Sequence, residues 1–130
     1  MSLLLTGRLS SGVWILSPSG PLTLGSGTER LREALIEKFD AGFHRLLIDC
    51  SGITTVDSQG LGEIVSAYSA IVRRGGALKL LHPSQRLQEL LAITRLDTLL
   101  ETYDDESAAL RSLNAQSSAK AKAALDAFLE

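Results

Sequence analysis

The feature that most constrains the fold is the alternation of short apolar runs with amphipathic helical stripes. The clearest stripe begins at Ser58 and ends at the basic and glycine-containing segment 73–76. Its apolar members are Leu61, Ile64, Val65, Tyr68, Ile71 and Val72. Apolar runs at residues 46–48 and 77–81 flank it, and such runs are typical of strands covered on both faces. Helices between such strands require crossover connections, so the sequence predicts an α/β fold with a mixed or largely parallel sheet.

The N-terminal part predicts a hairpin followed by a helix. Residues 3–24 alternate loosely and are interrupted at 10–12 by a turn-forming segment, which predicts two antiparallel strands. Ser26 and Glu29 have the spacing of a capping box, and an apolar residue recurs every four positions from Leu31 until Gly42. A first helix is therefore expected between these points.

The C-terminal part continues the alternation. A helix is expected after Pro83 and Ser84, then a short strand over 99–103 and a helix from 104 to 113, which gives the order ββαβαβαβα. We expect one domain over 1–113 and a tail over 114–130, with a break at 114–118. Residues 119–130 can form one more amphipathic helix, but about 12 residues are marginal for an isolated helix, so the tail must dock or fray.

Composition narrows the function classes. With 130 residues and 45% hydrophobic content, the chain can bury one core. The formal net charge of -2 and the absence of a dense basic cluster disfavour nucleic acid as a partner. One cysteine cannot close an internal disulfide, and no apolar run is long enough for direct membrane insertion, so a cytoplasmic protein is expected.

The most informative stretch joins a buried strand to the start of the strongest helix. Asp57 and Ser58 are both good helix caps, at a place where backbone N–H groups lack partners and favour an anion. Gly60 and Gly62 each cost about 1 kcal/mol relative to alanine in a helix, so close approach of another backbone is expected there. A phosphate on Ser58 would add roughly -1.5 to -2 charges without unfolding the helix.

The stretch 56–62, with the sequence VDSQGLG, resembles the phosphorylation loop of STAS domains of the anti-sigma factor antagonist type. Segments 20–22, 46–49, 75–80 and 87–100 resemble that family in order and spacing, so the resemblance covers about residues 5–113. It implies a STAS fold and a partner-switching regulator. Its partners would be an anti-sigma factor or related serine kinase and a phosphatase, and a homo-oligomer is also possible.

The resemblance assigns the phosphoacceptor role to Ser58. The expected partner-binding surface comprises Thr23, Thr55, Asp57, Ser58, Gln59, Gly60, Gly62 and Glu63. Thr23 stands where the family often has an acid, and Gln59 where a small hydroxyl residue is common. These two departures indicate a divergent member of the family.

Two other functions remain open on the sequence. One is a STAS adaptor subunit of a transport or stress-sensing complex, which would use the same surface without a phosphate cycle. The other is a serine hydrolase with Ser58 as nucleophile, although Val56 occupies the first glycine position of a nucleophile elbow. His44 and His82 have no partner ligands at metal spacing, so no metal is predicted. No cofactor and no catalytic residue are predicted either.

Overall fold

The computed structural model describes residues 2–115 and 118–129. Its strands are β1 (Leu4–Ser10), β2 (Val13–Leu22), β3 (Arg45–Asp49), β4 (Ile53–Val56), β5 (Ala77–Leu81) and β6 (Thr102–Tyr103). Its α-helices are α1 (Glu29–Asp40), α2 (Ser58–Arg73), α3 (Gln85–Ile93), α4 (Glu106–Ala115) and α5 (Ser118–Leu129). The structure also has two short 3-10 helices, η1 (Cys50–Gly52) and η2 (Leu96–Thr98).

The strands form a mixed sheet in the order β1-β2-β3-β5-β6, and β4 pairs with the far end of β2. The β1–β2 pair is antiparallel and the other pairs are parallel, which confirms the predicted α/β architecture. The hairpin turns at Ser11 and Gly12, with φ of 51° and 77°. Positive φ at both central residues is the mark of the tight turn that matches strand twist.

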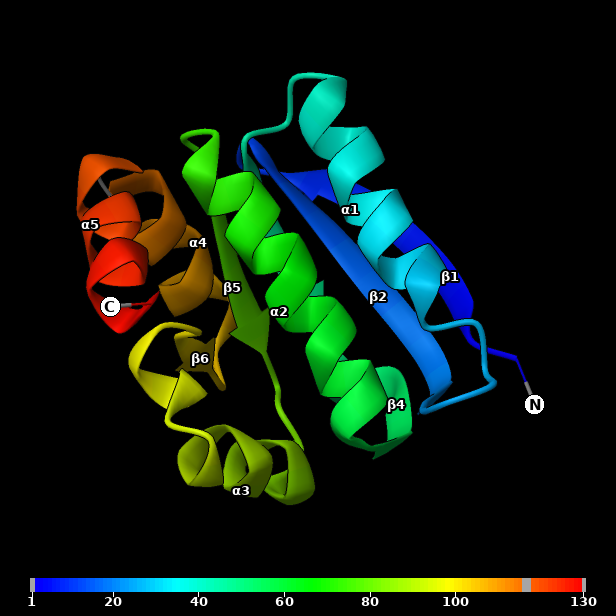
Figure 1. Ribbon diagram of the computed structural model, residues 1–130. Coiled ribbons are helices and arrows are strands. Elements are labelled where there is room, and N and C mark those ends of the chain that lie inside the picture. The colour runs from blue at the N-terminus through cyan, green and yellow to red at the C-terminus, as the bar shows by residue number, and fades with distance from the viewer. Residues whose placement is uncertain (1, 116–117, 130) are drawn as a thin grey trace.

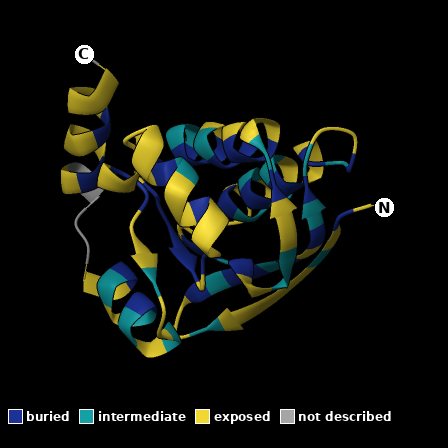
Figure 2. Ribbon diagram, turned by 90° about the horizontal axis from the view of Figure 1, so that it is seen from below, coloured by how far each residue is buried: buried dark blue, intermediate teal, exposed yellow. Residues whose placement is uncertain are grey.

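Helices cover both faces of the sheet. Helices α1 and α2 lie side by side on one face (Figure 1), while α4 lies on the other, as the view from below shows (Figure 2). Leu46 and Ile48 of β3 belong to the larger core on the α1–α2 side, whereas Leu47 points into the smaller core beneath α4. The apolar run at 46–48 is thus buried on both faces, as a central strand should be.

Two local expectations are corrected. The observed order is ββαββαβαβαα, which contains a strand, β4, that the predicted order lacks. The sequence does not indicate β4 because Thr54 and Thr55 are exposed, so this strand has no apolar pattern. Ser26 does not cap α1, which begins at Glu29. The Ser26 hydroxyl instead donates to the Thr23 carbonyl at 2.6 Å and holds the preceding loop.

The last strand and the tail also differ in detail. Residues 99–101 precede β6 instead of forming it, and the buried Leu99 and Leu100 follow η2. The break expected at 114–118 includes 116 and 117, which lie outside the described residues, while 114 and 115 belong to α4. Helix α5 packs against α2 through Ala121 and Leu125, which are 4% and 3% exposed.

Candidate functional site

The candidate site lies where two parallel strands end side by side. In the β2–β4 pair, Leu22 is opposite Val56, so the loop after β2 and the start of α2 leave the sheet at the same edge. This pairing brings Thr23 next to the Asp57–Ser58 turn, although about 35 residues separate them in sequence. Carboxyl ends of parallel strands are the usual place for functional loops in α/β proteins.

Asp57 joins the two loops. It is the N-cap of α2, as predicted, and its Oδ1 accepts from the Gly60 N–H at 3.0 Å. Its Oδ2 accepts from the Leu24 N–H at 3.0 Å, and its own N–H donates to the Leu22 carbonyl at 3.3 Å. The hydrogen bonds from the Leu24 and Gly60 amides hold the pKa of Asp57 below its ordinary value, so this carboxylate is ionised at neutral pH.

Ser58 is exposed at the first position of α2. Its side chain can therefore be reached by an enzyme from outside, which a phosphoacceptor requires. The unpaired amides and the positive end of the helix dipole favour an anion at this place. Gln59, Gly62 and Thr55 are exposed around it, and Thr23 is half-buried, so these predicted residues form one accessible surface.

The two glycines of the first turn have different surroundings. A Cβ added to Gly60 would lie 2.0 Å from the Leu22 carbonyl oxygen, so the helix start can approach β2 this closely only with glycine. The expected close backbone approach is confirmed there, and the other backbone is the chain's own. A Cβ on Gly62 would meet nothing within 4 Å, so no internal contact requires glycine at that position.

Gly60 and Glu63 are corrections to the predicted surface. Gly60 is buried against β2, and Glu63 is only 8% exposed. The Glu63 Oε2 lies 2.9 Å from the Arg32 guanidinium of α1, in an ion pair that lacks the alignment of a hydrogen bond. Glu63 therefore ties α2 to α1, and its carboxylate does not offer a free charge to a partner.

Leu24 is a residue that the sequence interpretation missed. Its side chain is 77% exposed while its backbone is fixed by the hydrogen bond to Asp57. An exposed apolar side chain on a fixed loop beside Ser58 can serve as an anchor for a partner. The sequence offers little to identify Leu24 as part of the site, because it is a single leucine between Thr23 and Gly25, at the end of a segment that predicts a strand.

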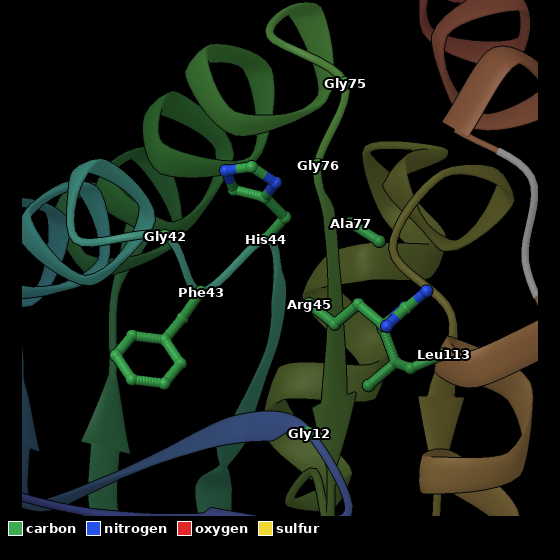
Figure 3. A pocket seen from close by; sticks show the side chains of 9 residues that line it. All are labelled: Gly12, Gly42, Phe43, His44, Arg45, Gly75, Gly76, Ala77 and Leu113. Carbon is green, nitrogen blue, oxygen red and sulfur yellow. The ribbon is translucent and has the colours of Figure 1, made fainter.

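A separate pocket of about 320 Å³ lies at the other end of the sheet, where β3 and β5 begin. Four glycines contribute to its lining, and the side chains of Phe43, His44 and Arg45 point in different directions (Figure 3). The described residues that line it do not bring a convergent set of polar groups together. This pocket offers less chemistry than the Asp57–Ser58 turn.

The described residues around Ser58 do not include the partners of a serine nucleophile. Within the described part of the chain, no histidine is hydrogen-bonded to Ser58; His82 instead lies 3.3 Å from Asp49, and His44 stacks on Phe39. A nucleophilic serine needs an adjacent base. Across residues 2–115 and 118–129, no helix combines the length and apolar character required to cross a membrane.

Comparison with known proteins places this geometry in a family. Residues 8–109 match the model of the STAS domain. The Thermotoga neapolitana homologue of TM1081, named as an anti-sigma factor antagonist, is 29% identical over 103 residues, which are 79% of this chain and 91% of that protein.

Solved structures share the fold. The crystal structure of TM1081 from Thermotoga maritima superposes with a TM-score of 0.77 at 23% identity, over 85% of this chain and 94% of that one. The phosphorylated form of SpoIIAA, a Bacillus cell fate determinant, gives 0.65 at 16% identity, over 83% of this chain and 98% of that one. The predicted resemblance is thus confirmed by the match over 8–109, and this chain belongs to the STAS domain family.

Proposed function

We propose that this chain is a partner-switching regulator of the anti-sigma factor antagonist type, and that Ser58 is its phosphoacceptor. One observation carries the proposal: Ser58 is exposed at the start of α2, on a turn that Asp57 ties to the loop after β2. The name of the Thermotoga neapolitana relative supports the class of regulator. The phosphorylated form of a protein with the same fold supports the modification.

The switch follows from electrostatics at the helix start. A phosphate on Ser58 adds roughly -1.5 to -2 charges beside the ionised Asp57, and the helix dipole stabilises those charges in the free protein. A partner that covers this turn must place its own groups against the new charge. An unpaired, desolvated phosphate costs a complex ~3 kcal/mol, or about a 150-fold loss of affinity.

The proposed contact surface is the accessible part of the site. It comprises Thr23, Leu24, Thr55, Asp57, Ser58, Gln59 and Gly62. Leu24 gives it an apolar anchor, and Gly62 leaves room for close approach of a partner backbone. The partner is an anti-sigma factor or related protein with serine kinase activity, and a phosphatase returns Ser58 to its unmodified form.

A STAS adaptor without a phosphate cycle is the second candidate. The observation that favours it is Thr23, which lies beside Asp57 where related antagonists often carry an acid. Such an adaptor would use the same surface, and its partner would bind equally well whether or not Ser58 carried a charge.

The two candidates are separated by affinity capture from the source cells, with mass spectrometry of Ser58 and of the captured partner. The captured partner is then titrated with the wild type, Ser58→Ala and Ser58→Asp. Ser66→Asp is the matched control, because Ser66 is an exposed serine farther along the same helix. The switch predicts that only Ser58→Asp loses binding, by at least tenfold; equal affinities for all forms would establish the adaptor.

A further inference from the structure

Lys79 is an unusual residue in the middle of β5. Its side chain is only 5% exposed, and its strand neighbours in the run 77–81 are apolar. A buried ammonium group is costly unless it is paired and hydrogen-bonded. The contacts of Lys79 therefore show how its charge is stabilised in this part of the molecule.

The Lys79 ammonium lies in a polar network of four side chains. Its Nζ donates to Glu101 Oε2 at 2.9 Å and to the Ser112 hydroxyl of α4. The Tyr103 hydroxyl donates to the same Glu101 oxygen at 2.7 Å. Burial raises the pKa of Glu101, but the hydrogen bonds from Lys79 and Tyr103 outweigh it, so the pKa lies below its ordinary value and the pair is ionic.

Three of these side chains, those of Lys79, Glu101 and Ser112, line a cleft of about 540 Å³, a volume within the usual range of small-molecule sites. Side chains of α2, β5, α4 and α5 form its walls. Tyr68 lines it from α2, ten residues and roughly 15 Å along the helix from Ser58. Because α5 follows the matched range 8–109, this cleft includes a wall outside the family region.

The lining selects for a particular chemistry. Lys79 and Lys120 bring two ammonium groups against one carboxylate, Glu101, which leaves one positive charge in excess. Burial and the nearby Glu101 charge raise the pKa of Tyr68, so its hydroxyl remains a hydrogen-bond donor at neutral pH. An ammonium carries three donors, and Lys79 directs two of them to oxygens of described residues, so one remains for a ligand.

Apart from Thr98, the remaining lining is apolar. Leu99, Ala121 and Ala124 provide it, the last two from α5. A bound molecule would therefore meet hydrogen-bond donors at one end and aliphatic surface along its body. We propose that this cleft binds a small organic carboxylate with a short apolar chain, and that the bound anion lies between Lys79 and Lys120.

The experiment titrates the full chain with three probes: octanoate, octan-1-ol and inorganic phosphate. Calorimetry gives the affinity, and amide chemical shifts give the location. The cleft predicts saturable octanoate binding with shifts at β5, Ser112 and α5, and at least tenfold weaker binding of the alcohol and of phosphate. Equal binding of octanol would show mere apolar association, and equal binding of phosphate would show that charge alone is recognised; either result would overturn the proposal, as would the absence of saturable octanoate binding.

Variants locate the anion. Lys120 is exposed, so Lys120→Met should leave the fold intact and weaken octanoate binding about five- to tenfold. Lys122→Met is the matched control, an exposed lysine on the same helix that does not line the cleft. If the Lys79→Met protein folds, it should not bind octanoate. If it does not fold, the affinity of Lys120→Met for octanoate tests the position of the carboxylate. Equal losses in Lys120→Met and Lys122→Met would contradict the assigned position of the carboxylate.

Discussion

Gly60→Ala and Gly62→Ala form a matched pair with opposite expected effects. Both add one methyl group to the first turn of α2, where alanine gains about 1 kcal/mol over glycine from helix propensity. At Gly60 the new Cβ would lie 2.0 Å from the Leu22 carbonyl oxygen and 2.8 Å from its carbon. Because the obstacle is backbone, the helix start must move away from β2 by more than about 1 Å.

That movement has a calculable cost. It strains the packing by about 3 kcal/mol and weakens the hydrogen bond from Asp57 N–H to Leu22, worth about 1 kcal/mol. After the gain in helix propensity, Gly60→Ala should lower the free energy of unfolding by about 3 kcal/mol, or roughly 10 °C in melting temperature. Gly62→Ala, with open space around its Cβ, should raise it by up to about 1 kcal/mol.

Urea unfolding followed by circular dichroism measures both changes. If the Ser58 surface binds a partner through Gly62, the more stable Gly62→Ala protein should also bind that partner less tightly. Equal midpoints for Gly60→Ala and the wild type would refute the close approach of α2 to β2. A destabilised Gly62→Ala would refute the open surroundings assigned to that position.

Three further predictions concern the core, the cap and the cysteine. Leu61 is 5% exposed, so Leu61→Ala should cost about 2 to 5 kcal/mol, and an unchanged denaturant midpoint would show that the helical stripe is misplaced. The pKa of Asp57 is lowered in the folded protein, so the contribution of its carboxylate to stability is complete above the ordinary carboxyl range and is lost as pH falls through the lowered value. Denaturant midpoints measured from pH 2 to 6 should therefore fall less on acidification for Asp57→Asn than for the wild type. An equal pH dependence of the midpoints in the two proteins would contradict this. Burial raises the pKa of Cys50 to about 12, so the folded protein should resist a thiol reagent at pH 8 that labels it rapidly in urea, and equal rates would mean that Cys50 is accessible.

The parts of the fold that sequence could predict are those whose cause is local. The stripe along α2, the stop at 73–76 and the Asp57 cap depend on residues within a few positions of each other, and all three are present. β4 could not be predicted in the same way, because Thr54 and Thr55 are exposed and the strand is stabilised by pairing with β2.

In the candidate site, too, the features with a local cause could be predicted and those that depend on contacts between elements could not. The position of Ser58 at a helix start could be predicted from local sequence, but the placement of Leu24 beside it depends on a hydrogen bond to Asp57 across 33 residues. Glu63 belongs to the same predicted surface, but the structure buries its side chain. Only the packing of α1 against α2 brings Arg32 within ion-pair distance and buries it. Contacts between elements that are distant in sequence cannot be predicted from a local sequence pattern.

The central claim is that charge on Ser58 blocks a partner and leaves the domain folded. The most direct test compares protein carrying phosphoserine at position 58 with the unmodified protein, measuring affinity for the captured partner and the urea midpoint of each. The account predicts an affinity lower by about 150-fold and midpoints that agree within about 1 kcal/mol in unfolding free energy. Equal affinities, or a phosphorylated protein that unfolds, would contradict it.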